Sequence, residues 1–184
     1  MEHMLSTLID KPVASLFGVI AMVCIMIWPL FGVRQNMLLV YLGNDLAFAA
    51  HYALLDQGTA SAMNVLLGVQ TAAAIYLERL PASRWFYIAL IPVVAGASLM
   101  TWQGMTSFLA ATATMLSTVG KMQRNEIALK LLVLSQAPFW ALHDLMVGSL
   151  PGFIAAVVNI ATGIVVLMRM ADRRALKSEM PFSS

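Results

Sequence analysis

The chain has 184 residues, of which 60% are hydrophobic and only 11% are charged, and its formal net charge is +2. A soluble domain carries roughly 25% charged residues, so this chain has too few to cover a water-facing surface. The small net charge gives no reason to expect a nucleic-acid partner. The composition therefore predicts an integral membrane protein whose main surroundings are the lipid bilayer. Cys24 is the single cysteine, which excludes a disulfide framework.

Apolar runs divide the chain into seven segments, and a helix needs about 20 apolar residues to cross a bilayer. The first run is too long for the apolar part of a signal peptide and does not follow a basic cluster, so we expect it to remain as a helix. The predicted helices cover about residues 12–33, 35–56, 59–77, 85–103, 104–120, 127–148 and 151–168. The charged residues 169–184 are expected to form a short, loosely ordered cytoplasmic tail.

Lysine and arginine residues are divided unevenly between the two sides that seven spans would create. Lys11 is alone on the side of the N-terminus. The other side receives Arg34, Arg79, Arg84, Lys121, Arg124, Arg169, Arg173, Arg174 and Lys177, and Lys130 lies close to it. Basic residues concentrate on the cytoplasmic side of membrane proteins. We therefore expect a multi-pass protein of the inner (plasma) membrane, with its N-terminus outside and its C-terminus in the cytoplasm.

Polar and aromatic residues follow the same order in the two halves of the chain. The second predicted helix carries Asn44, Phe48 and His51, and the sixth carries Gln136, Trp140 and His143 at the same spacing. The third carries Asn64 and Gly68, and the seventh carries Asn159 and Gly163. The pattern predicts an all-α membrane protein with two parallel three-helix repeats, residues 1–84 and 104–168, joined by an inverting helix at 85–103. Solute sites in such proteins lie near the midplane between the repeats.

At these residues the chain resembles the SWEET, SemiSWEET and PQ-loop transporter superfamily, and over its whole length it most resembles the YgjV-like bacterial inner-membrane family. The resemblance implies a three-plus-one-plus-three helix plan with the N-terminus outside. It also implies that Asn64 and Asn159 enclose a substrate together with Phe48 and Trp140. The chain departs from the sugar transporters because it lacks the Pro-Gln dipeptide and has no proline in its second and fifth predicted helices.

Side chains on four predicted helices are expected to line one central cavity, because a polar group inside the bilayer is costly unless it is hydrated or paired. The candidate substrate-binding residues are Asn64, Asn159, Phe48, Trp140, Asn44, Asp45, Gln136, His51 and His143. Amide and aromatic groups without a basic residue suit a small neutral polar solute, sugar-like or nucleoside-like. The predicted function is transport by alternating access, and the alternative is a non-transporting scaffold or a ligand-sensing receptor on the same fold.

Each candidate also has a structural interpretation. Asn64 and Asn159 are typical of hydrogen bonds between helices, and Phe48 and Trp140 of ordinary packing. Asp45 lies near the middle of its predicted helix, so we expect it to be protonated in at least one conformation; the equivalent residue of the second repeat is Ala137. The sequence shows no zinc motif, phosphate-binding loop or serine nucleophile elbow, so we expect no enzymatic activity, cofactor or metal. A homo-oligomer is possible.

Overall fold

The computed structural model of the chain describes residues 7, 9–27, 34–77, 83–121, 131–132 and 134–179. Seven helices lie within those residues: α2 (Pro12–Ile27), α3 (Arg34–Leu54), α4 (Gly58–Leu77), α5 (Ser83–Met100), α6 (Met105–Lys121), α8 (Ala137–Val147) and α9 (Leu150–Glu179). The predicted end of the first helix at residue 33 and the predicted start of the sixth at residue 127 lie outside the described residues.

The all-helical architecture with seven helices is confirmed. Judged by length and hydropathy together, none of the helices in the described part of the chain meets the usual requirement for a membrane-spanning segment. The membrane-spanning arrangement therefore stays a prediction.

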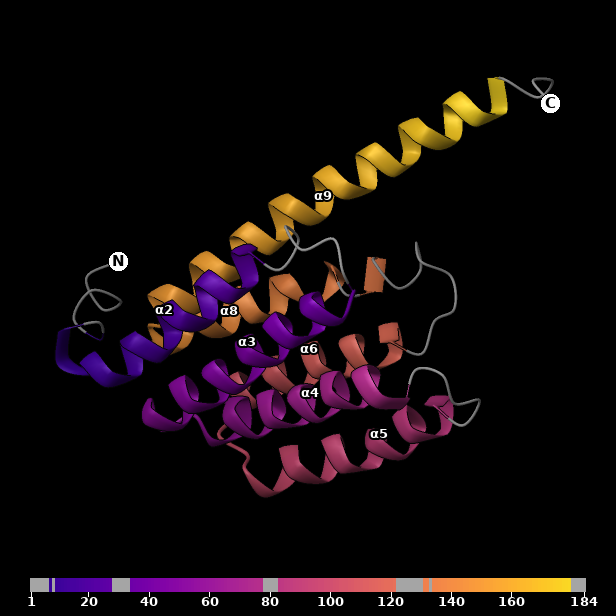
Figure 1. Cartoon of the computed structure of the whole chain (residues 1–184). Coiled ribbons are helices and arrows are strands. Elements are labelled where there is room, and N and C mark those ends of the chain that lie inside the picture. The colour runs from indigo at the N-terminus through magenta and orange to yellow at the C-terminus, as the bar shows by residue number, and fades with distance from the viewer. Residues whose placement is uncertain are drawn as a thin grey trace.

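Six of the helices form a closed ring. Around it each helix contacts the next in the order α2, α3, α4, α6, α8 and α9, and α9 returns to α2. Helix α5 packs on the outside of α4 and α6 (Figure 1). The two predicted repeats occupy matching places in this ring. If each helix of the first repeat is exchanged with its counterpart in the second (α2 with α6, α3 with α8 and α4 with α9), the order of helices around the ring stays the same. The middle helix of each predicted repeat, α3 or α8, thus lies between its two companions.

The sixth predicted helix loses its regular hydrogen bonding at Gln136, although the Gln136 backbone keeps right-handed helical angles (φ −74°, ψ −28°). The backbone N–H groups of Phe139 and Trp140 both donate to the Gln136 carbonyl, at 3.1 and 3.2 Å. Pro138 lies in the first turn of α8. Proline has no N–H, and its ring clashes with the carbonyl of the residue four positions earlier, here Leu134. The chain therefore restarts its helix beside Gln136.

Helix α9 is longer than predicted. The sequence suggested an end near residue 168 and a loosely ordered tail, but the helix continues to Glu179 and projects from the bundle (Figure 1). The prediction overlooked that residues 169–179 are mainly Arg, Ala, Leu, Lys and Met, which are strong helix formers. The charged residues end the apolar run at this point, but the helix continues through them.

Three connecting segments meet at one end of the bundle. The Lys11 ammonium lies 2.8 Å from a carboxylate oxygen of Asp56 and donates to the Leu54 carbonyl at 3.1 Å. The Gln103 amide donates to the Asp56 carbonyl at 2.8 Å. The segments before α2, between α3 and α4, and between α5 and α6 thus share this end, as helices that alternate in direction require.

Candidate functional site

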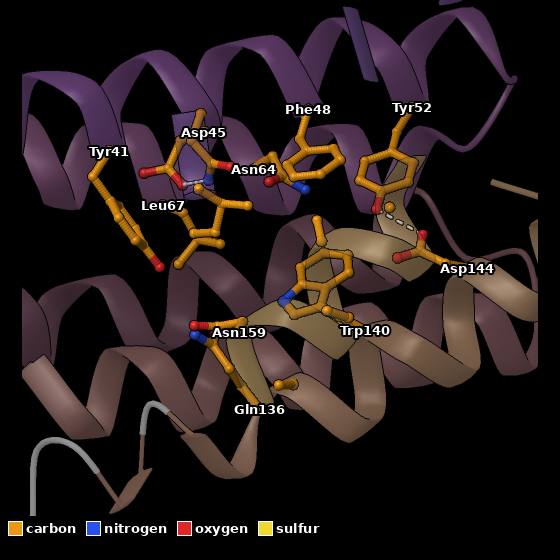
Figure 2. A pocket seen from close by; sticks show the side chains of 16 residues that line it. Tyr41, Asp45, Phe48, Tyr52, Asn64, Leu67, Gln136, Trp140, Asp144 and Asn159 are labelled. Atoms are coloured by element: carbon orange, nitrogen blue, oxygen red, sulfur yellow. Dashed lines mark hydrogen bonds between the residues drawn. The ribbon is translucent and has the colours of Figure 1, made fainter. Parts of the chain in front are cut away.

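A pocket of about 60 Å³ lies between α3 and α4 on one side and α8 and α9 on the other (Figure 2). Seven of the nine candidate residues line it: Asn44, Asp45, Phe48, Asn64, Gln136, Trp140 and Asn159. The volume admits a few water molecules. It is smaller than the roughly 300–1,000 Å³ of pockets that hold small organic molecules. The pocket in this structure is therefore large enough for water but not for an organic solute.

Two tyrosines of α3 reach across the pocket at its two ends. The Tyr52 hydroxyl donates a 2.7 Å hydrogen bond to Asp144 Oδ1 on α8. The Tyr41 side chain extends toward the Gln136 side chain, just before α8, and both line the pocket (Figure 2). Figure 2 shows Tyr52 and Asp144 at one end and Tyr41 near Gln136 at the other. Each of these pairs takes one residue from the first half of the chain and one from the second.

Three aromatic rings that line the pocket stack between these ends. Phe48 and Tyr52 stack with their centroids 5.6 Å apart and their planes 16° apart. Tyr52 and Trp140 stack at 5.8 Å and 11°. The planes of Phe48 and Trp140 are therefore close to parallel. Phe48 and Tyr52 project from α3 and Trp140 projects from α8, and Tyr52 stacks on both of the other rings (Figure 2).

His51, one of the predicted substrate-binding residues, is not among the residues that line the pocket. It is 2% exposed, and its Nδ1 and Nε2 atoms lie 2.7 Å from the Ala14 carbonyl and from Ser149 Oγ. A carbonyl only accepts, so Nδ1 carries the hydrogen and Nε2 accepts from the serine hydroxyl, as in a neutral imidazole. The ring fits against α2 because residue 18 is glycine: a Cβ at Gly18 would lie 2.9 Å from the ring. His51 therefore joins α2 to the turn before α9.

His143 packs against two of the aromatic rings and also does not line the pocket. Its Nδ1 is 3.2 Å from Asp144 Oδ1, and its ring packs edge-on against Tyr52 and Trp140 at 5.2 and 5.5 Å. His143 therefore contacts three pocket-lining residues, Tyr52, Trp140 and Asp144, without lining the pocket itself.

Sequence reasoning left Tyr41, Tyr52 and Asp144 out of the candidate set, although all three line the pocket. The sequence does give a signal for two of them. Tyr52 directly follows His51 and Asp144 directly follows His143, and these two histidines occupy equivalent positions of the predicted repeats. Gly152 on α9 makes room for the acid. A Cβ at Gly152 would lie 2.6 Å from the Asp144 carboxylate, so only glycine lets that carboxylate lie against α9.

Asp45 is 1% exposed and is hydrogen-bonded on both oxygens. The Asn44 amide donates to its Oδ1 at 3.3 Å, and its Oδ2 lies 2.8 Å from the Thr71 hydroxyl. Thr71 also lies 2.9 Å from the Leu67 carbonyl of its own helix. One hydroxyl hydrogen cannot serve both acceptors fully. If Thr71 donates to Leu67, a protonated Asp45 completes the network by donating to Thr71.

Asn64 and Asn159 line the same pocket from α4 and α9 (Figure 2). The Asn64 amide nitrogen donates to the Ala60 carbonyl at 2.9 Å. This bond lies within α4, so it does not join two helices. Close helix packing comes instead from Gly163, where a Cβ would lie 2.5 Å from Leu134.

A metal centre has no candidate in the described ranges, where no three His, Cys, Asp or Glu side chains are grouped so that they could hold an ion. The two histidines nearest the pocket are engaged with a carbonyl, a serine and a carboxylate.

A family comparison covers nearly all of this architecture. The model of a family described as bacterial inner membrane protein, Imp-YgjV, matches residues 12–174. The chain belongs to the Imp-YgjV family. The match spans the whole pocket, and the family description supports a place in the bacterial inner membrane. Neither the curated proteins nor the solved structures give a significant match. A relation between Imp-YgjV and the SWEET superfamily stays a prediction.

Proposed function

We propose that this protein is a membrane transporter that moves a small neutral polar solute by alternating access between two three-helix repeats. The seven helices would cross the inner membrane with the N-terminus outside. The observation that carries the proposal is the pocket, which is lined by amide and aromatic groups from both halves of the chain. No lysine or arginine is among the described residues that line it, so a neutral solute suits it better than an anion.

Residues at equivalent positions of the two predicted repeats line the pocket from α3 and from α8. Tyr52 and Asp144 are 92 residues apart, and the same interval relates Phe48 to Trp140. The ring of helices also keeps its order of neighbours when the two halves are exchanged. In transporters built from parallel repeats, the solute binds where the repeats meet, next to interrupted helices. The local loss of regular helical hydrogen bonding at Gln136 lies at this pocket.

Alternating access requires contacts between the halves that break and re-form. The bonds of Tyr52 to Asp144 and of His51 to Ser149 both join the halves near the end that also holds Lys11. Each hydrogen bond of this kind contributes about 0.5–3 kcal/mol, the larger values applying to bonds with a charged group. Differences of that size are within what a bound solute can supply when it prefers one conformation. These contacts would therefore form an outer gate.

Uptake by proteoliposomes tests the proposal. The purified full-length protein is reconstituted and incubated with glucose, uridine and uracil, and the internal solutes are measured by mass spectrometry. We expect at least one solute to enter about tenfold faster than into protein-free liposomes. Asn159→Ala should abolish this uptake, whereas Thr162→Val, an exposed site on the same helix, should retain it. Binding without uptake would favour the receptor alternative.

A further inference from the structure

Two buried polar atoms beside Tyr52 lack a hydrogen-bond partner in the described part of the chain. One is Nε2 of His143, whose ring lies 5.2 Å from the Tyr52 ring. The other is Oε1 of Gln57, whose backbone N–H donates to the Tyr52 carbonyl at 2.8 Å. A buried polar atom without a partner destabilises the fold. A group that pairs with both atoms would therefore be stabilising.

The relation between the predicted repeats indicates that these two atoms face each other. The interval of 92 residues that relates His51 to His143 also relates Gln57 to Ser149. Gln57 and Ser149 each directly precede a helix, α4 and α9. His51 Nε2 lies 2.7 Å from Ser149 Oγ. The equivalent contact in the other half is between His143 Nε2 and the Gln57 side chain.

Both unpaired atoms are hydrogen-bond acceptors. His143 Nδ1 lies 3.2 Å from Asp144 Oδ1, which also accepts from the Tyr52 hydroxyl at 2.7 Å. An ionised carboxylate only accepts, so Nδ1 carries the ring hydrogen and Nε2 has a free lone pair. The Gln57 amide oxygen is an acceptor as well. A single proton added to Nε2 would pair both atoms at once.

The charge of Asp144 also favours a proton at this place. Its side chain is 1% exposed, and among the described residues His143 is the one basic side chain within 4 Å of its carboxylate. A carboxylate buried without a cation is costly. A protonated His143 supplies the missing cation next to it.

The other titratable groups near His143 are already engaged. On α3, Tyr52 gives its hydrogen to Asp144, and His51 uses both ring nitrogens in hydrogen bonds. Asp56, next to Gln57, pairs with Lys11 at 2.8 Å, and its side chain is 88% exposed. The neighbouring parts of α4, α6 and α9 contain no titratable side chain over residues 58–75, 105–120 and 150–168.

We propose that His143 is the binding site of a coupling proton, held between the Asp144 carboxylate and the Gln57 amide oxygen. This inference rests on the proposed transport function and names the ion that drives it. A hydronium ion gives its proton to the Nε2 lone pair and leaves water. Nδ1–H then donates to Asp144 and Nε2–H to Gln57. The new bond joins α8 to the segment before α4, so proton uptake strengthens the outer gate.

Nitrogen NMR of the histidine rings, in the full-length protein in detergent, tests the inference. The ring-nitrogen shifts distinguish a ring with one hydrogen from a ring with two. As the pH falls, His143 should take up a second ring hydrogen, whereas His51 should keep one. A His143 ring that keeps one hydrogen at every pH at which the protein stays folded would overturn the inference. A water molecule that donates to both atoms would then explain the pair.

Gln57→Leu separates proton binding from folding. The proton affinity of His143 should fall about tenfold, since a hydrogen bond to the charged ring is lost. The unfolding temperature should stay the same or rise, because an unpaired acceptor is removed. Gln103→Leu is the matched control at the same end of the bundle, where Gln103 donates to the Asp56 carbonyl, and it should leave the titration unchanged. Unchanged proton affinity in Gln57→Leu would contradict the inference.

Proteoliposomes test whether the bound proton drives transport. His143→Gln should lose solute accumulation driven by a pH gradient, because glutamine cannot bind and release a proton. Wild-type uptake that ignores the gradient would overturn the coupling, even if His143 binds the proton. If His143 takes up the proton but no solute enters, the transport function fails and the proton-binding site stands.

Discussion

Tyr52 and Asp144 lie 92 residues apart and meet in a 2.7 Å hydrogen bond, although they occupy equivalent positions of the two predicted repeats (Figure 2). Each is nearly inaccessible, at 2% and 1% exposure. A pair related in this way lies close to the axis that would relate the repeats. Its bond therefore marks the place where the two halves touch at one end of the pocket.

Tyr52→Phe removes this bond and keeps the aromatic stack. The Asp144 carboxyl group then loses its phenolic donor, so the free energy of unfolding should fall by about 1–3 kcal/mol. Chemical unfolding in detergent measures the change. Tyr76→Phe is the matched control, since Tyr76 on α4 is 81% exposed and its loss of a hydroxyl should have no effect. Equal stability of the two variants would show that the bond does not hold the halves together.

Gly152→Ala displaces Asp144. Its Cβ would lie 2.6 Å from the carboxylate, so the helices must shift, at a cost of about 1–3 kcal/mol in unfolding free energy. Gly96→Ala on α5 is the control, because a Cβ there meets no atom within 4 Å and alanine favours helix by up to about 1 kcal/mol. In thermal unfolding, Gly152→Ala should lower the unfolding temperature and Gly96→Ala should raise it. A neutral Gly152→Ala would mean that Asp144 has room to move.

Pro138→Ala tests the irregular helical hydrogen bonding beside the pocket. Alanine restores an N–H that can bond to the Leu134 carbonyl, so α8 should extend backward and carry the Gln136 side chain away from its present place. We expect uptake to fall by about tenfold or more with no loss of stability. Pro92→Ala, in α5 outside the ring of six helices, should transport normally. Normal uptake by Pro138→Ala would show that transport does not depend on the irregular helical hydrogen bonding at Gln136.

Asp45→Asn tests whether this carboxyl group carries a proton. Asparagine can keep hydrogen bonds to Thr71 and Asn44 but cannot bind and release a proton. We expect the variant to bind solute and to lose accumulation driven by a pH gradient across the liposome membrane. Asp56→Asn, an exposed acid at the end of the bundle, should behave as wild type. If wild-type uptake ignores the gradient and Asp45→Asn is tolerated, Asp45 only donates a hydrogen bond or stabilises the fold.

The sequence indicated the helices and most of the pocket because both depend on local patterns. Apolar runs show where helices lie, and steps of three and four residues show which side chains share a face, as for Asn44 and Phe48. The irregular hydrogen bonding at Gln136 and the length of α9 were missed because hydropathy does not report backbone hydrogen bonding. The partner of Tyr52 could not be predicted, because contact across 92 residues depends on how α3 packs near α8.

His51 shows that side chains on one face of a helix do not all reach the same cavity. It lies on the same face of α3 as Asn44 and Phe48, yet its ring hydrogen-bonds with Ala14 and Ser149 outside the pocket. Its position depends on Gly18, which lets the ring approach α2. A stripe of polar residues therefore predicts burial better than it predicts contact with one cavity.

Access to the pocket from both sides of the membrane is the central claim, and cysteine labelling measures it directly. Cys24 is replaced by alanine, and Ala156, a small pocket-lining residue of α9, by cysteine. A membrane-impermeant thiol reagent is applied to intact cells and to inverted vesicles. We predict that Ala156→Cys reacts from both sides, whereas Val157→Cys, on the exposed face of α9, reacts from neither. Reaction of Ala156→Cys from one side only, or from neither, would contradict alternating access.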